Sequence, residues 1–554
     1  MPNITWMKRL LPVLHEDPML LAVVKPAGID TGSYTGQPTQ GVQELLRAER
    51  GPKAILLPIN RLSRYESGIL LFAKADGFAR IMKKAWRAGD ISQDFVAVAK
   101  GEVKERKLVI DSAHGASRGR SRPGTKKAKA PAVAERGSGT ATSVESLKAY
   151  GDRVLIRCRT TVDNTHAMRA QLRAAGLQLL GDRAPGRFQR EPRYAETCLH
   201  LSRLVFSHPD RGVKLTLTCP VPPAFDAHVH KRTDWSRPIY AAMVRRLPVL
   251  ARTDTSAYRL LSGHVEDMRG VTVERLGELV IIRSESDSKA EEAFFRAMAE
   301  FYREWLGVKI VVWRRIPKKG KPVDDESWAD SSHDKVLLGK AFPDELTVVE
   351  NGLKYLVRPG APTTSGLFLD QRENRSRVRA LSRDKDVLNL FAYSCGFSVA
   401  AAAGGARRVV SVDLSPKNIE WGKANFALND LPVDGHLFLA AHVAQFLKRG
   451  AKDEEKYDLI VVDPPSFAHG RKSGQDFSVE RDLTGLVASI APLLRKGGCL
   501  LVSMNLRRMS WRAFRERVRA GLGARKISGM EALPLPADFA MDSDHAKSLL
   551  VTVA

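Results

Sequence analysis

Short apolar runs alternate with segments of helical spacing over residues 346–554. An Ala-rich segment at 399–403, predicted to be helical, separates the first two runs. The runs that we predict as strands are 387–391, 409–413, 459–462 and 499–503. Strand–helix–strand alternation is typical of a parallel sheet with helices on both faces. We therefore predict a C-terminal α/β domain.

Residues 1–240 show a different pattern, with few helical segments between short apolar runs. The runs at 19–24, 69–73 and 95–99 predict strands of a mixed, β-rich domain. A basic, low-complexity insert occupies about 112–140, and its apolar content is too low to form a core. We expect this insert to be disordered when free. It is either a solvated loop or a tether for RNA phosphates.

Residues 250–345 combine both patterns. Apolar runs at 257–261 and 279–282 predict strands, and apolar residues at helical spacing predict a long helix over 290–306. The aromatic stripe of that helix is interpreted as core. The whole chain is thus predicted to be a multidomain α/β protein with a small central α+β domain.

The charge balance indicates the class of partner. The 554 residues include 88 Lys+Arg and 62 Asp+Glu, a formal net charge of +26. This excess favours nucleic acid, through phosphate neutralisation, over a membrane surface. A general solubility charge is the alternative.

The five scattered cysteines, without a Cys-x-x-Cys pair, favour neither a disulfide framework nor a metal site and fit a reducing cytoplasm. No apolar run reaches the length of a membrane span, and the N-terminal pattern does not predict a signal peptide.

Polar residues follow three of the predicted C-terminal strands. The first strand leads into a loop with Gly396, the second ends at Asp413, and the third is followed by Asp463 and two prolines that end the strand. A carboxylate at Asp413 suits the ribose hydroxyls of an adenosine cofactor, although a single Asp there is also a common helix cap. The first loop lacks Gly-x-Gly-x-x-Gly, which argues against NAD.

Four segments make residues 363–554 resemble the S-adenosylmethionine (SAM)-dependent methyltransferases of large-subunit ribosomal RNA. They are Gly-Leu-Phe-Leu-Asp-Gln-Arg at 366–372, Asn-Leu-Phe-Ala-Tyr at 389–393, Ser-Val-Asp-Leu-Ser at 411–415 and Asp-Pro-Pro-Ser-Phe at 463–467. Residues 250–345 resemble the central domain of the RlmI-like members. The resemblance implies a Rossmann-like class I methyltransferase domain over 346–554 and the cofactor SAM. The cofactor-binding residues it implies are Phe368, Asp370, Arg372, Tyr393, Gly396, Asp413, His442 and Asp463.

The same resemblance implies where the target base binds. Chemistry on a paired base requires its extrusion from the stack, and the Asp-Pro-Pro-Ser-Phe loop is expected to hold the extruded base. The catalytic residues implied are Asp463, Pro464, Pro465, Phe467 and Asn505, with Ser503 and Arg507 orienting the base. At the third cofactor motif this chain has His442 where the family has Asp, and a neutral imidazole is a weaker acceptor for the adenine amino group.

Two subfamilies differ at the strand end near residue 504. Cytosine-5 enzymes need a nucleophilic Cys there, because carbon 5 reacts only after a thiolate adds to the ring. Met504 occupies that place. The RlmK-like guanine methyltransferases are similar to this chain at 477–482, 503–508 and 535–539. A guanine ring nitrogen already has a lone pair, so positioning suffices. The resemblance thus implies a 7-methylguanine type of product in 23S rRNA or a large-subunit precursor.

Residues 13–230 resemble the RluA-type pseudouridine synthases, through segments such as Arg61-Leu62-Ser63-Arg64 and Thr165-His166-Ala167-Met168-Arg169. The family's catalytic Asp is replaced by Ser63, and its active-site Tyr by Phe95, whereas Arg169 is retained. A hydroxyl without an activating base is a poor substitute for a carboxylate nucleophile. We expect a catalytically inactive domain that docks RNA. The alternatives are an active or bifunctional pseudouridine synthase, and a non-catalytic ribosome-assembly factor.

Overall fold

The computed structural model describes most of the chain as two compact units, Met1–Ala251 and Arg252–Ala554. The predicted basic insert at 112–140 lies outside the described residues. The residues described are 11–32, 41–51, 53–103, 107–110, 141–161, 165–182, 197–229, 236–266, 268–285, 292–315, 334–341, 343–361, 365–468, 477–542 and 544–554. No helix among them is long and apolar enough to cross a membrane.

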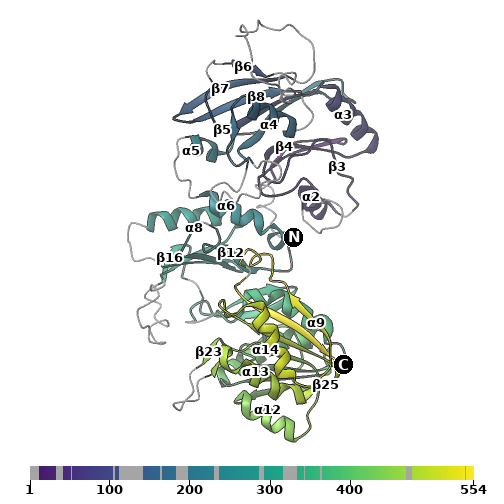
Figure 1. The fold of residues 1–554 in the computed structure, drawn as a ribbon, viewed down its shortest axis with the longest axis vertical. Helices are drawn as coiled ribbons and strands as arrows, with labels where there is room; N and C mark the ends of the chain where they lie inside the picture. Colours follow the sequence, from purple (N-terminus) through teal and green to yellow (C-terminus); the bar gives the residue numbers. More distant parts are fainter. Residues whose placement is uncertain are drawn as a thin grey trace, which may run out of the picture. The chain divides into compact units, whose positions relative to one another are not determined.

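The described part of the first unit is built on one sheet of eleven strands (Figure 1). Its strands are β1 (Val13–Glu16), β2 (Leu20–Lys25), β3 (Leu57–Pro58), β4 (Ser67–Ala73), β5 (Ser92–Lys100), β6 (Lys107–Ile110), β7 (Thr142–Tyr150), β8 (Arg153–Thr160), β9 (Gln178–Leu179), β10 (Leu199–Ser207) and β11 (Lys214–Thr218). The helices are α2 (Val42–Arg50), α3 (Asp76–Ala88), α4 (Thr165–Ala174), α5 (Pro223–Val229), α6 (Ser236–Arg245) and α7 (Leu247–Leu250). Only β10 and β4 pair in parallel among these strands, which agrees with the mixed, β-rich prediction.

A smaller sheet begins the second unit. Its five strands, in spatial order, are β12 (Ala257–Ser262), β13 (Val271–Leu276), β14 (Leu279–Ser284), β15 (Ile310–Arg315) and β16 (Asp334–Leu338). The predicted long helix is α8 (Glu292–Leu306), which connects the parallel pair β14 and β15. The aromatic stripe is core only in part: Phe295, Met298 and Tyr302 are buried, and Phe295 stacks on Trp313 of β15 at 4.8 Å. Its other aromatic residues are half-buried; they are Phe294, Phe301 and Trp305.

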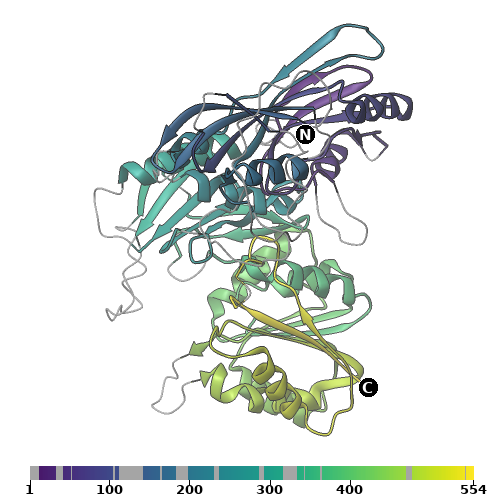
Figure 2. The ribbon, with the colours of Figure 1, turned by 45° about the horizontal axis from the view of Figure 1, so that its top comes forward.

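The predicted parallel sheet follows in the part of the chain drawn green to yellow (Figure 2). Its strand order is β21-β20-β19-β22-β25-β27-β26. The first five strands are parallel, β27 is antiparallel to β25, and the edge strand β26 is antiparallel to β27. Its strands are β19 (Asp386–Leu390), β20 (Arg408–Asp413), β21 (Leu437–Ala440), β22 (Tyr457–Val462), β25 (Leu494–Met504), β26 (Ile527–Leu533) and β27 (Lys547–Val553). The hairpins β17 (Leu346–Glu350) with β18 (Leu353–Val357), and β23 (Phe467–Ala468) with β24 (Phe477–Ser478), lie outside it.

Helices cover both faces of this sheet because its strands are apolar on both faces. The α-helices are α9 (Arg372–Leu381), α10 (Gly396–Ala403), α11 (Pro416–Leu428), α12 (Val443–Lys452), α13 (Val479–Ile490) and α14 (Trp511–Leu522). Leu388 and Leu390 share a core with α12, α13 and α14, whereas Val387 packs with α9 and α10. Alternation along a strand thus divides the core into two layers.

A buried ion pair joins three parts of the second unit. Arg372, the first residue of α9, donates from Nη1 and Nη2 to the two carboxylate oxygens of Asp538, at 2.8 Å each. Asp538 lies in the segment between β26 and β27, and it also accepts from the backbone N–H of Arg259 in β12 at 2.9 Å. Both charged side chains are essentially inaccessible to solvent, at 1% and 0% exposure. The pair therefore fixes the central sheet against the seven-stranded sheet.

Replacing Arg372 by Met is expected to lower the free energy of unfolding by about 3–5 kcal/mol, because Asp538 would remain buried without its cation. Urea unfolding followed by circular dichroism measures this loss. Arg377→Met is the matched control on the same helix, since Arg377 pairs with Glu531 at the surface and such pairs contribute about 1 kcal/mol or less. Equal losses in the two variants would contradict the assigned role of Arg372.

Candidate functional site

The predicted site residues gather at one edge of the second unit's parallel sheet. Asp413 ends β20, and the other three residues follow β19, β22 and β25, which run in the same direction as β20; they are Tyr393, Asp463 and Asn505. In the sheet, β20 and β21 lie on one side of β19, and the later strands β22 and β25 lie on the other, so the strand order reverses at β19. Such a switch point is where open α/β sheets bind ligands, at the carboxyl ends of the strands.

The loop after β19 has an unusual backbone. Phe391, Tyr393 and Cys395 have φ angles of 56°, 48° and 60°, in the left-handed region that side chains disfavour. Asp413 holds this loop, because its Oδ2 accepts from the Tyr393 N–H at 2.8 Å. Non-glycine residues in this region cluster at ligand sites, where the surroundings maintain the strain. The sequence gives no signal of it, since none of the three is glycine.

Asp413 keeps capacity for a ligand. Its Oδ1 accepts from Ser415 N at 2.9 Å and from Asn418 Nδ2 at 3.0 Å, so three donors approach a carboxylate with about four lone-pair sites. Leu414, the next residue, is 69% exposed. His442 is exposed at the N-cap of α12. An acceptor, an exposed apolar side chain and an imidazole together fit the ribose and adenine of SAM.

The segment before α9 approaches the same loop. The Phe368 ring is 43% exposed and lies 5.6 Å from the Tyr393 ring. Gly366 has a φ of 105°, and a Cβ there would lie 2.2 Å from the Trp421 indole, so only glycine fits. Arg375 donates to the Phe368 carbonyl at 2.7 Å and holds Glu350 through two further bonds. Buried cations thus fix the position of this segment.

Two of the predicted cofactor residues lie deeper than the others. Arg372 holds Asp538 and is 1% exposed, so its guanidinium positions the segment from within. Asp370 is 8% exposed, and its Oδ2 lies 3.5 Å from His545 Nε2. Gly396 begins α10, where the Arg375 side chain would lie 3.4 Å from an added Cβ. Direct contact of Arg372 with the cofactor stays a prediction.

Asp463 is supported by a buried polar network. Ser503 accepts from Gln371 Nε2 at 2.6 Å and from the Ser548 hydroxyl at 3.0 Å. Its own proton is then directed to Asp463, with which it forms a hydrogen bond. Burial, followed by the negative charge of Asp370, raises the pKa of Asp463 to about 7. Its carboxyl group therefore titrates near neutral pH.

The rest of the Asp-Pro-Pro-Ser-Phe loop presents an aromatic face. The Ser466 hydroxyl donates to the Asn505 carbonyl at 2.7 Å, which ties the loop to the end of β25. Pro464 is buried and Pro465 exposed. Phe467 is 51% exposed, as a ring that stacks on an incoming base would be before binding.

No cysteine of the chain is exposed, and Met504 is fully buried in the core. Burial raises the pKa of the Cys395 thiol to about 12, so it does not supply a thiolate at neutral pH. Cys499 is half-buried near the Thr552 hydroxyl. The site therefore lacks the thiolate that attack on a pyrimidine carbon requires.

Two of the first unit's predicted site residues, Ser63 and Arg169, contact a carboxylate that the sequence did not point to. Glu66 accepts from Ser63 N at 2.8 Å, from Thr165 Oγ1 at 2.9 Å and from Arg169 Nη1 at 3.3 Å. Ser63 is exposed, whereas Glu66 is 0% exposed and Phe95 only 2%. The signal available was an acid three residues after Ser63. The buried carboxylate is occupied by internal donors and faces no solvent.

Comparisons with known proteins agree with this division. The model of the S-adenosylmethionine-dependent methyltransferase family matches residues 326–550, and that of the RNA pseudouridylate synthase family matches residues 19–174. The ribosomal RNA large subunit methyltransferase of Deinococcus radiodurans is 31% identical over 327 residues, which cover 57% of this chain and 78% of that protein. The chain belongs to this methyltransferase family. Its cofactor is S-adenosylmethionine.

Other relatives match in part. The ribosomal RNA large subunit methyltransferase K/L of Alteromonas mediterranea is 31% identical over 289 residues, 52% of this chain, and the chain spans only 39% of its length. Among solved structures, the methyltransferase SMU.776 complexed with SAH aligns with a TM-score of 0.51 and 25% identity, over 63% of this chain and 88% of that one. The methyltransferase fold of the second unit and the pseudouridine-synthase-like domain of the first unit are therefore both confirmed.

Asp463→Asn is expected to stabilise the protein at pH 8 by about 1–3 kcal/mol, after allowance for partial solvent access. The folded protein raises the pKa of Asp463 from its ordinary value of 3.8 to about 7. Stability from this group is thus present at low pH and is lost as the pH rises through 7. Asn does not ionise and avoids that loss. Urea unfolding at pH 8 and near pH 4.5 measures the difference, which should shrink on acidification.

The exposed Asp453→Asn serves as the control, because this carboxylate lies on the surface next to Arg449. If Asp463→Asn does not raise the free energy of unfolding at pH 8, or raises it more at low pH, the proposed burial of the Asp463 charge is contradicted.

Proposed function

We propose that this protein transfers the methyl group of SAM to a guanine ring nitrogen, of the 7-methylguanine type, in large-subunit ribosomal RNA. The observation that carries the proposal is that the Asp463–Phe467 loop lies at the same carboxyl edge of the sheet as Asp413, at a site without an accessible thiol. The named substrate of the relatives, large-subunit ribosomal RNA, supports the substrate class. The formal charge of +26 fits a polyanionic partner.

The chain's own residues would hold and orient the reactants. Asp413 accepts from the ribose, and Phe467 stacks on the extruded base. Bound SAM would supply an electrophilic sulfonium methyl group to the lone pair of the guanine nitrogen, with the sulfur leaving as a neutral thioether. The purine gains positive charge in this step. Asp463 and Asp370 place carboxyl groups next to the developing charge, which lowers its energy in a site sheltered from water.

The N-terminal domain is proposed to be inactive in pseudouridine formation and to dock RNA. Three observations support this: no described residue forms a hydrogen bond to the Ser63 hydroxyl that would activate it, the Glu66 carboxylate is buried, and Arg169 is held by Asp182 at 2.9 Å as well as by Glu66. A nucleophile must reach the target nucleotide, and Glu66 is 0% exposed.

With labelled SAM and unmodified large-subunit ribosomal RNA, the full chain is expected to incorporate label that is recovered as 7-methylguanine after hydrolysis. Asp463→Ala should lower the rate by about 100-fold or more, because the base is no longer positioned. Asp453→Ala, at the surface, should leave it unchanged. The measurement is methyl incorporation against time.

Label in 5-methylcytosine, or a full rate in Asp463→Ala, would overturn the assignment of the reaction. Absence of heat when SAM is titrated into the protein by calorimetry would instead favour a non-catalytic RNA-binding role. Pseudouridine formed without SAM, and lost in Glu66→Gln, would show that the N-terminal site is active.

A further inference from the structure

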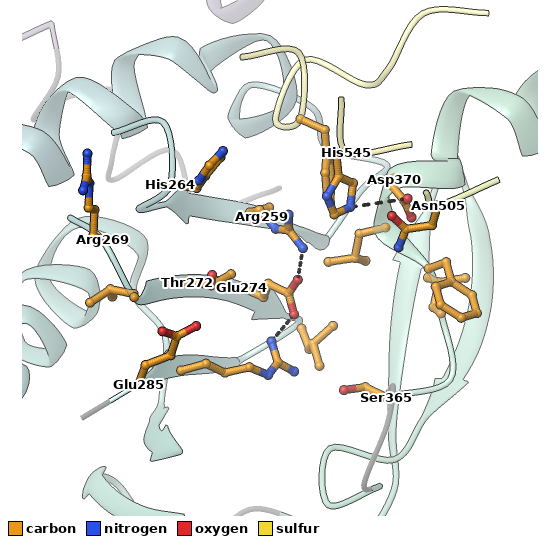
Figure 3. A pocket seen from close by; sticks show the side chains of 18 residues that line it. Arg259, His264, Arg269, Thr272, Glu274, Glu285, Ser365, Asp370, Asn505 and His545 are labelled. Atoms are coloured by element: carbon orange, nitrogen blue, oxygen red, sulfur yellow. Dashed lines mark hydrogen bonds and ion pairs between the residues drawn. The ribbon is translucent and has the colours of Figure 1, made fainter. Parts of the chain in front are cut away.

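A cavity of about 730 Å³ lies in the second unit between the central sheet and the methyltransferase sheet (Figure 3). Strands β12, β13 and β14 provide one wall. The segment 365–370, with Asn505, Phe539 and His545, provides the other. Its volume falls within the roughly 300–1,000 Å³ of small-ligand sites. The cavity thus adjoins the methyl-transfer site, because Phe368, Asp370 and Asn505 line it.

One face of the central sheet changes character along its strands. The apolar positions of this face belong to the core shared with the methyltransferase sheet; they are Ala257, Leu276, Leu279, Ile281 and Val312. Side chains two residues further along a strand share the same face. Those positions are polar and line the cavity; they are Arg259, Thr272, Glu274 and Arg283. Half of the face is therefore used for packing, and half is left open.

The polar half carries a charged triad. Arg259 Nη2 lies 3.0 Å from Glu274 Oε1, and Arg283 Nη1 bonds the other carboxylate oxygen. Although burial opposes ionisation, the two guanidinium groups hold the pKa of Glu274 at about 2. Removing three charges from water is costly, and apolar side chains would often pack there with equal or greater stability. A structural purpose alone therefore gives little reason for the triad.

The two ends of the cavity differ in chemistry. Figure 3 shows Arg269 and Glu285 toward one end, and Asp370 and Asn505 toward the other. Arg269 is exposed on the turn between β12 and β13, and it forms no ion pair with any residue that the structure describes. His264 on the same turn is also exposed. An available guanidinium thus stands at the end away from the methyl-transfer site.

We propose that this cavity binds the RNA nucleotide next to the methylated one, with its phosphate on Arg269. The proposal rests on the proposed function, which places RNA at the Asp463–Phe467 loop. The neighbouring nucleotide of an RNA strand bound there must lie next to the methyl-transfer site. The cavity occupies such a position, because Phe368, Asp370 and Asn505 belong to both.

The lining suits a nucleotide. Phe368 is 43% exposed, and the Arg259 guanidinium lies 4.1 Å from the centre of the Phe539 ring. Unstacked RNA bases bind to aromatic rings and to guanidinium planes. Thr272 and Glu285 offer a donor and acceptors to a base edge. A purely apolar ligand would leave these polar groups without hydrogen-bond partners.

The test is the binding of a fluorescent single-stranded RNA hexamer to the full chain, followed by anisotropy over a range of salt concentrations. Thr272→Trp fills the cavity and is expected to raise Kd about 10-fold with an unchanged salt slope. Arg269→Ala is expected to raise Kd about 5-fold and to reduce the slope of log K against log salt by about 0.7, because one phosphate contact is lost.

Arg303→Ala is the matched control, since Arg303 lies on α8 of the same small domain, pairs with Glu300 and does not line the cavity. It should change Kd less than two-fold. SAM binding by calorimetry, equal to that of the unaltered chain, shows that each variant is folded.

Unchanged Kd in Thr272→Trp and Arg269→Ala, or an equal loss in Arg303→Ala, would overturn the inference. This readout does not require methyl transfer. If the unaltered chain transfers no methyl group but the cavity variants still bind the hexamer more weakly, the proposed function is contradicted and the cavity site stands. If Thr272→Trp transfers methyl groups with an unchanged KM for RNA, the cavity site is contradicted and the proposed function stands.

Discussion

The buried ion pair between Arg372 and Asp538 is the interaction on which the rest of the second unit depends. It joins the first turn of α9, strand β12 and the segment between β26 and β27, which are distant in the sequence. A buried charge without a partner is costly, so these three parts can only assemble together. The position of Phe368 and Asp370 follows, because both lie within the four residues before Arg372. One geometric constraint thus sets a wall of the cofactor site and a wall of the cavity.

Acidic groups concentrate where the ion pair has placed them. Asp463 and Asp370 approach each other next to the Ser503 network, and burial with mutual repulsion raises the pKa of Asp463. Perturbed pKa values of this kind are characteristic of functional sites. The strained loop at Tyr393 and Cys395 lies beside them and is held by Asp413. Strain and repulsion both destabilise the free protein, and bound ligands can offset both.

The candidate sites of the two units differ in how open their side chains are to a ligand. In the second unit, acceptors and apolar rings are left open: Asp413 has spare capacity, and Leu414, Phe467 and Phe368 are exposed. In the first unit, Glu66 is closed off by Ser63, Thr165 and Arg169. Open groups favour a ligand, whereas satisfied buried groups favour stability. This contrast supports a single catalytic centre in the chain.

The sequence by itself determined the layers and the chemistry of the strand ends. Short continuous apolar runs specified the strands, and the order Gly396, Asp413, Asp463 specified one ligand-binding edge, because parallel strands bring their carboxyl ends together. It did not determine that Glu66 fills the first unit's site, nor that Arg372 holds Asp538. Those contacts join residues 103 and 166 positions apart in the pairs Glu66–Arg169 and Arg372–Asp538. Only tertiary packing decided them, since burial and partner distance are properties of the assembled chain.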